Sequence, residues 1–190
     1  MNTQAMIERL AVLFGYPGPD FHRHVTTALE AMENDGGVDG DARISLTQFA
    51  SATAEYDTDE LRELYTRTFD LNPLCTLEIG WQLYGEDYHR GEFLVKMRQQ
   101  LRQYQLRESA ELPDHMTHAM ALLAKLEPDE AAEFAGSYLL PALDKMVSGW
   151  REHRNGYAAL LESAFAFLKS RYPYVPLRTA LGGPELPVLQ

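Results

Sequence analysis

Cysteine is nearly absent from the chain, and so are long apolar runs. Cys75 is the single cysteine among 190 residues, which excludes an intramolecular disulfide and leaves no C-x-x-C pair for zinc. The longest uncharged apolar runs, such as residues 134–143, are too short to cross a bilayer, and this one contains a proline. The first residues lack the basic segment of a secretory signal, and Glu8 and Arg9 interrupt the apolar stretch that follows. We therefore expect a cytoplasmic protein with no membrane-inserted segment.

Catalytic signatures are also missing. The chain has no G-x-S-x-G elbow, no phosphate-binding P-loop and no H-E-x-x-H zinc motif. A di-iron bundle needs two E-x-x-H motifs, and the sequence offers one, Glu86-x-x-His89. His115 and His118 are spaced to share a metal, which keeps a helical metalloenzyme as an alternative. The sequence favours a protein that is not an enzyme and carries no metal or cofactor of its own.

Negative charge is concentrated in one third of the sequence. The chain has a formal net charge of −11. Residues 30–87 contain 14 acids and 3 bases, whereas the remainder contains 14 of each sign. Such an acidic field repels nucleic acid and anionic membranes and attracts basic partners. A face that merely keeps the protein soluble is the other interpretation.

Apolar residues recur at helical spacing along almost the whole chain, and no segment alternates with a period of two. This pattern predicts an all-α fold, a single-domain helical bundle of about eight to ten helices. Asp57 followed by Glu60 resembles a capping box and predicts a helix start. The bundle is expected to span residues 1–172. Residues 173–190 hold four prolines and two glycines, which predicts an extended, mobile tail.

Two apolar segments give more specific predictions. Residues 74–84 contain one charged residue, Glu78, and are predicted to form a helix buried at the centre of the core, with Leu77 and Trp81 inside. Cys75 and Trp150 are likewise predicted to be core residues. Pro141 interrupts an otherwise continuous helical pattern, which predicts a kink there.

The densest polar cluster is Glu111-Leu-Pro-Asp-His115. Pro113 is expected to start a helix. Asp114, near that start, can cap free backbone N–H groups, and His115 can be satisfied by the adjacent carboxylate. A free imidazole titrates near neutral pH, which would make any contact of His115 pH-sensitive.

Four short motifs together resemble a known family. They are Glu111-Leu-Pro-Asp-His115, Tyr65-Thr-Arg-Thr-Phe-Asp70, Leu83-Tyr-Gly-Glu86 and Arg90-Gly91, and they occur in the family's usual order. The chain resembles the molybdoenzyme-specific chaperones of the nitrate reductase delta-subunit group, which are related to the chaperones of trimethylamine-oxide and dimethyl-sulfoxide reductases. The resemblance covers about residues 5–170. Family members that serve nitrate reductase often continue well beyond such a short proline-rich tail. The identity of the client therefore stays open between nitrate reductase and another enzyme of the same superfamily.

The resemblance implies a cytoplasmic assembly factor, monomeric or homodimeric. Its partner would be the apo catalytic subunit of a molybdenum oxidoreductase, recognised through an N-terminal or twin-arginine-type peptide and kept open until the molybdenum cofactor is inserted. An arginine-bearing amphipathic helix would be attracted to the acidic field. A protein-binding adaptor that is not a chaperone is the remaining alternative. The client-binding residues implied are Asp114, His115, Glu111, Pro113, Tyr65, Phe69, Asp70 and Glu86. The Asp114–His115 pair is expected to face a groove between two helical layers.

Overall fold

The computed structural model describes residues 3–34, 40–150 and 155–174, and these residues form the predicted all-α bundle. No strand occurs among them, and an isolated antiparallel bridge joins Glu78 to His115. Ten α-helices and two π-helical turns make up the described part of the chain. In order they are α1 (Thr3–Leu13), α2 (Phe21–Glu33), α3 (Gly40–Thr53), α4 (Thr58–Tyr65), η1 (Thr66–Asp70), α5 (Ile79–Tyr84), α6 (Tyr88–Gln103), α7 (Met116–Leu123), α8 (Pro128–Phe134), η2 (Ala135–Leu139), α9 (Leu140–Gly149) and α10 (Gly156–Arg171).

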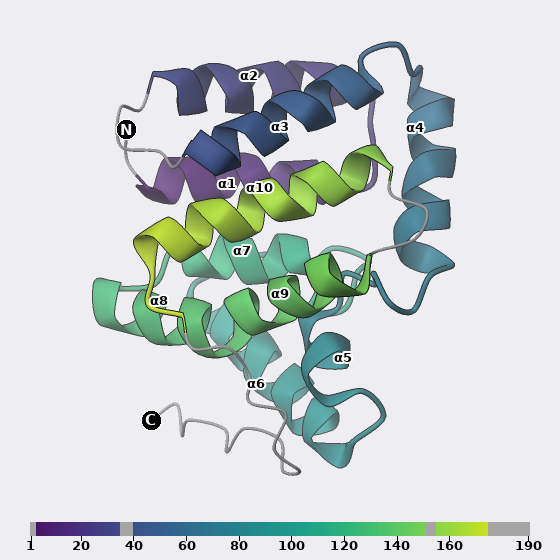
Figure 1. Ribbon diagram of the computed structural model, residues 1–190. Coiled ribbons are helices and arrows are strands. Elements are labelled where there is room, and N and C mark those ends of the chain that lie inside the picture. Colours follow the sequence, from purple (N-terminus) through teal and green to yellow (C-terminus); the bar gives the residue numbers. More distant parts are fainter. Residues whose placement is uncertain (1–2, 35–39, 151–154, 175–190) are drawn as a thin grey trace.

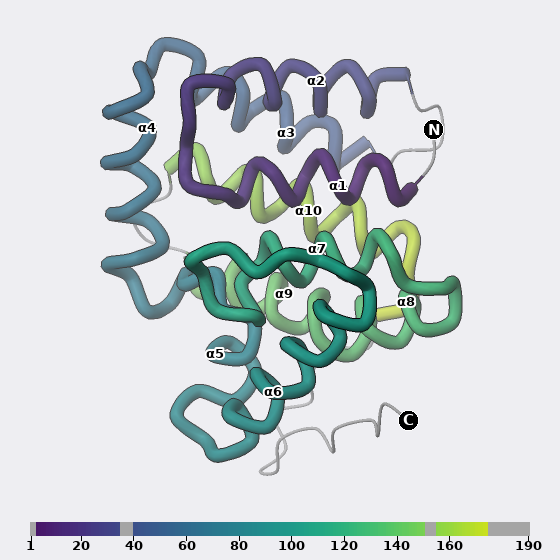
Figure 2. Tube along the Cα trace, turned by 180° about the vertical axis from the view of Figure 1, so that it is seen from behind, coloured from purple at the N-terminus to yellow at the C-terminus, as the bar shows by residue number. Residues whose placement is uncertain are grey.

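The helices stack in layers, with α4 standing across one end of the stack (Figure 1). Helices α2 and α3 form the outermost layer, and α1 and α10 lie beneath them. The view from behind shows α1 running over α7, with α5 and α6 at the opposite side of the molecule from α2 (Figure 2). In this arrangement α10 packs between α3 and α9, although more than 100 residues separate α3 from α10 in the sequence.

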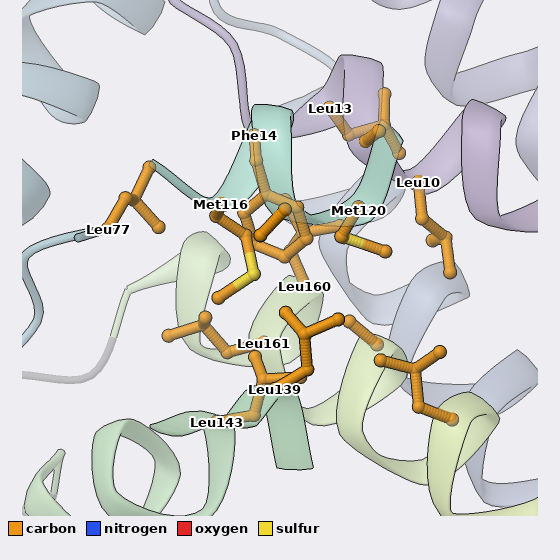
Figure 3. Packing of buried hydrophobic residues seen from close by; sticks show 14 of the residues in the cluster. Leu10, Leu13, Phe14, Leu77, Met116, Met120, Leu139, Leu143, Leu160 and Leu161 are labelled. Carbon is orange, nitrogen blue, oxygen red and sulfur yellow. The ribbon is translucent and has the colours of Figure 1, made fainter. Parts of the chain in front are cut away.

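The centre of the core lies between α1, α7, α9 and α10. Leu10, Leu13 and Phe14 meet the two methionines of α7 (Figure 3). The opposite side of this cluster consists of leucines from the end of η2, α9 and α10, all fully buried: Leu139, Leu143, Leu160 and Leu161. Side chains of this size each contribute roughly 1.5–3 kcal/mol when removed from water, so these four helices account for much of the stability.

The expected central helix over residues 74–84 is wrong in its extent and its place. Helix α5 begins only at Ile79, and the side chain of Leu74 is 64% exposed. Leu77 is buried as predicted, but Trp81 is only partly buried and lies under the guanidinium of Arg90. Hydrogen bonds within the segment explain the difference, because the buried amide of Gln82 donates to the carbonyls of Leu74 and Thr76. These bonds hold residues 74–77 as a loop despite their helical apolar pattern.

Several local signals elsewhere in the sequence were reliable. The capping box forms as predicted, because Asp57 accepts from the Glu60 N–H while the Glu60 side chain accepts from the Asp57 N–H. Cys75 and Trp150 are buried, as expected. Pro141 lies just after the π-helical turn η2, and widening of the preceding turn is one way in which a helix accommodates the ring and missing N–H of proline.

The predicted tail falls mostly outside the described residues. Its first two residues, Pro173 and Tyr174, are described and lie against the bundle. A Cβ atom built on Gly136 would come within 2.6 Å of the Pro173 carbonyl oxygen, and the Tyr174 hydroxyl donates to Asp144 Oδ2. In the ranges that the structure describes, no helix is both long and apolar enough to span a bilayer.

Candidate functional site

The segment that ends in Asp114 and His115 is joined by backbone hydrogen bonds to the loop before α5. The Met116 N–H donates to the Leu77 carbonyl over 2.8 Å, and the Ile79 N–H donates to the Asp114 carbonyl over 3.1 Å. These two bonds bracket the bridge between Glu78 and His115. The 111–115 motif and the loop before α5, more than 30 residues apart in sequence, are thereby brought side by side.

Asp114 is fully buried and caps a helix other than its own. Its Oδ2 atom accepts the Gly80 N–H over 2.9 Å, which satisfies a free donor in the first turn of α5. A Cβ atom on Gly80 would lie 2.6 Å from this oxygen and 2.9 Å from Phe93, so the close approach requires glycine. Burial raises the pKa of the Asp114 carboxyl, although the Gly80 N–H and nearby Arg90 act in the opposite direction. A carboxylate so enclosed does not face a groove.

His115, rather than Asp114, caps α7, which begins at Met116 and not at Pro113. Its Nδ1 atom accepts the Thr117 N–H over 3.3 Å and lies 2.8 Å from Thr117 Oγ1. Because Nδ1 accepts, the ring proton lies on Nε2, which is 3.5 Å from the Tyr65 hydroxyl. Burial lowers the pKa of His115 to about 4, and nearby His118 adds to this effect. The expectation that this histidine titrates near neutral pH is therefore wrong.

Tyr65 and Phe69 belong to a buried aromatic cluster. The Tyr65 ring packs edge-on against Phe69 and Tyr16, with centroids 5.0 and 5.4 Å away, and its hydroxyl donates to the Phe14 carbonyl. Phe69, which lies in η1, contacts Tyr157 at 4.9 Å. The two family-motif aromatics thus fix η1 against the core. Burial raises the pKa of Tyr65, with additional contributions from three carboxylates described next.

Three acids from separate parts of the chain act electrostatically on the Tyr65 hydroxyl. Asp70 ends η1, Glu78 precedes α5, and Glu111 lies in the loop before α7; each raises the pKa of Tyr65. Asp70 and Glu111 are exposed and Glu78 is half-buried. Exposed leucines lie within four residues of these acids in the sequence: Leu71 (74% exposed), Leu74 (64%) and Leu112 (42%). We call these six residues the Tyr65 surface, which combines negative charge with apolar side chains.

The structure thus divides the predicted site residues into groups. Five of them are buried: Asp114, His115, Pro113, Tyr65 and Phe69. Two are exposed at the Tyr65 surface, Asp70 and Glu111. Glu86 is exposed as well, but it lies in the turn between α5 and α6. Sequence reasoning missed Glu78 and the three leucines. The leucines that adjoin Asp70 and Glu111 in the sequence were the available signal for an apolar binding surface. Leucines at helical spacing are equally typical of core residues, so the sequence alone does not separate the two.

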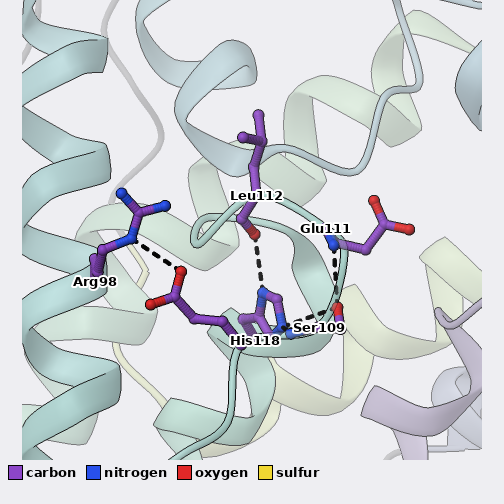
Figure 4. A network of polar contacts seen from close by, with 6 residues as sticks. Arg98, Ser109, Glu111, Leu112 and His118 are labelled. Carbon is purple, nitrogen blue, oxygen red and sulfur yellow. Dashed lines mark hydrogen bonds and ion pairs between the residues drawn. The ribbon is translucent and has the colours of Figure 1, made fainter.

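The loop before α7 is held by a polar network around His118 (Figure 4). His118 is buried in α7, where its Nε2 atom accepts the Ser109 N–H over 3.0 Å and its Nδ1 atom lies 2.9 Å from the Leu112 carbonyl. The Ser109 hydroxyl in turn accepts the Glu111 N–H over 3.2 Å. Arg98 on α6 pairs with Glu108 over 2.9 Å. The position of Glu111 therefore depends on contacts made behind the surface.

The two histidines considered as metal ligands are engaged with the protein. The rings of His115 and His118 lie 6.4 Å apart, and both nitrogens of each ring have protein partners. Across the described ranges 3–34, 40–150 and 155–174, no group of three or more histidine, cysteine or acidic side chains is placed to hold a metal ion.

Comparison with known proteins gives similarities over most of the chain. The sequence model of the family described as "Nitrate reductase delta subunit" matches residues 35–162. The chain is 26% identical over 160 residues to the nitrate reductase molybdenum cofactor assembly chaperone NarJ of Escherichia coli, in strain K12 and in O157:H7 alike; the match covers 83% of this chain and 67% of the relative. A crystal structure of a candidate redox enzyme maturation protein from Archaeoglobus fulgidus has the same fold, with a TM-score of 0.63, 20% identity and coverage of 89% and 95% of the two chains.

Proposed function

Because the chain belongs to the nitrate reductase delta-subunit family, we propose that it is an assembly chaperone for a molybdenum oxidoreductase. In this role it is not a catalyst. It acts in the cytoplasm on the apo catalytic subunit, binds the N-terminal segment of that subunit, and assists insertion of the molybdenum cofactor. The description of the Escherichia coli relatives as molybdenum cofactor assembly chaperones for nitrate reductase supports this role.

The observation that carries the binding step is the composition of the Tyr65 surface. Three carboxylates act electrostatically on one hydroxyl group there, and three exposed leucines are near neighbours of these acids in the sequence. An amphipathic helix bearing arginines complements such a surface, because its apolar face covers the leucines and its guanidinium groups pair with the carboxylates. Charge complementarity of this kind governs association rate and choice of partner more than affinity.

Burial of the Asp114–His115 pair gives it a supporting role in this proposal. Neither side chain reaches solvent, so neither touches a peptide on the surface. Their hydrogen bonds instead join the loop before α5 to the start of α7, and thereby fix Glu78 beside Glu111. The exposed members Asp70, Glu111 and the leucines are the residues that contact the client.

The test uses a synthetic peptide with the N-terminal sequence of the catalytic subunit, titrated into the protein by calorimetry. Surface charges are screened beyond about 10 Å at 0.1 M salt, so affinity should fall as salt is raised. The double variant Asp70→Asn, Glu111→Gln should weaken binding by up to about thirtyfold, since exposed ion pairs contribute roughly 0.2–1 kcal/mol each.

The matched control is Glu30→Gln, Glu33→Gln, which removes the same charge from the exposed side of α2 and should leave affinity unchanged. Equal losses in both double variants would mean that the acidic residues act only through net charge. Molybdoenzyme activity in cells that lack the wild-type gene provides the second readout. A protein that neither binds the peptide nor restores activity would be an adaptor of another kind, and the proposal would be wrong.

A further inference from the structure

The segment that carries Glu111 and Leu112 has no regular structure of its own to hold it. It follows α6, passes through Gln105 with a φ of 55°, and reaches the start of α7 without an intervening helix. Ser109, Glu111 and Leu112 are all exposed. A segment of this kind takes its shape from side chains that clasp its backbone.

His118 provides such a clasp with both of its ring nitrogens. The Ser109 N–H donates to Nε2, so Nε2 carries no proton; the proton therefore lies on Nδ1 and is donated to the Leu112 carbonyl. One rigid, buried ring thus binds a donor and an acceptor three residues apart (Figure 4). The Ser109 hydroxyl extends the clasp to the Glu111 N–H.

We propose that His118 is a positioning residue for client binding: it fixes residues 109–112 so that Glu111 and Leu112 are presented at the Tyr65 surface. This inference rests on the function proposed above. A leucine could fill the same buried space, but it would make neither of these contacts to the backbone of residues 109–112. The paired contacts on the backbone instead demand a side chain with one donor and one acceptor at a fixed separation.

The experiment compares three substitutions at this position and its neighbour. His118→Leu keeps the bulk and removes both contacts, whereas His118→Gln keeps one donor and one acceptor on its terminal amide. Ser109→Ala, at an exposed position, removes the hydroxyl that accepts the Glu111 N–H and lies 3.2 Å from His118 Nε2, but it leaves the Ser109 N–H bound to the ring. This variant keeps the protein foldable if His118→Leu proves insoluble. His24→Leu on α2 serves as a control for loss of a histidine elsewhere.

Two readouts are needed, amide hydrogen exchange of residues 109–112 and affinity for the client peptide. In His118→Leu the Ser109 amide should exchange at least tenfold faster and the peptide should bind about tenfold more weakly, with His118→Gln restoring most of both. Ser109→Ala should speed exchange of the Glu111 amide and weaken binding about threefold.

Unchanged exchange in His118→Leu and Ser109→Ala would overturn the inference, as would faster exchange with unchanged affinity. Failure of His118→Gln to restore either readout would overturn it as well. If the wild-type protein binds no client peptide, the proposed function fails, and the exchange readout alone then upholds or refutes the clasp.

Discussion

Protonation of His115 should destabilise the protein because it removes the cap of α7. In the neutral ring, Nδ1 accepts the Thr117 N–H, and the proton on Nε2 points to the Tyr65 hydroxyl. A second proton would occupy Nδ1, which could then no longer accept the Thr117 N–H and would point a donor at a donor. Burial adds a further cost to the charged ring, and together these effects place the pKa of His115 at about 4.

The magnitude follows from the difference between the folded and unfolded pKa values. Because the folded pKa lies below the ordinary 6.5, the unfolded chain binds the proton first, and stability is lost as the pH falls below about 6.5. The difference corresponds to about 3 kcal/mol when both states are fully protonated, at 1.36 kcal/mol for each unit of pKa. Roughly 2 kcal/mol of this loss should be reached by about pH 5.

The assay is urea unfolding at several pH values for the wild type and for His115→Asn. Asparagine caps helices well and does not titrate, so this variant should lose about 2 kcal/mol less stability between pH 7 and pH 5. Other buried groups, including Asp114, are the same in both proteins and cancel in the comparison. His22→Asn, at an exposed position on α2, should follow the wild type. Parallel curves for the wild type and His115→Asn would refute the reasoning.

Three further substitutions test the packing around this site by chemical unfolding. Gly80→Ala should cost about 1–3 kcal/mol, since its Cβ would meet Asp114 Oδ2 at 2.6 Å and Phe93 at 2.9 Å; wild-type stability would disprove that close approach. Asp114→Asn should raise stability at pH 7. Burial raises the pKa of this carboxyl, so the stability that the protonated carboxyl contributes is lost as the pH rises through its folded pKa. The advantage of asparagine should therefore vanish in acid. Tyr157→Phe should be neutral or stabilising by about 1 kcal/mol, as its buried hydroxyl has no partner within the described ranges, and a marked loss would reveal a missed contact.

Helical periodicity was sufficient to predict the architecture, because each amphipathic helix records in its own sequence which face is buried. The capping box at Asp57 is likewise a local device, and it forms as the spacing predicts. The segment 74–84 shows where this reasoning stops. Its apolar residues satisfy a helical pattern, but the Gln82 amide binds two carbonyls of the segment and holds its first part as a loop. No spacing rule contains that information.

The candidate site was predictable only in part, for the same reason. Resemblance to a family pointed to Asp114 and His115, and both lie at the junction that organises the site. Their burial could not be inferred, because the oxygen that accepts the Gly80 N–H lies 34 residues away in sequence. The convergence of Glu78 and Glu111 near Tyr65 is also a product of tertiary structure. Charge counting found the acidic block but not which acids share a surface.

The position of α10 between α3 and α9 has a consequence for how the chain is made. Synthesis proceeds from the N-terminus, so the apolar face of α3 leaves the ribosome long before α10 exists to cover it. Loop-closure entropy makes such distant pairings slow to form. Nascent helices that await a late partner expose surface prone to aggregation. A protein proposed to protect an unfinished enzyme therefore passes through an unfinished state of its own, which ends only when α10 has been translated.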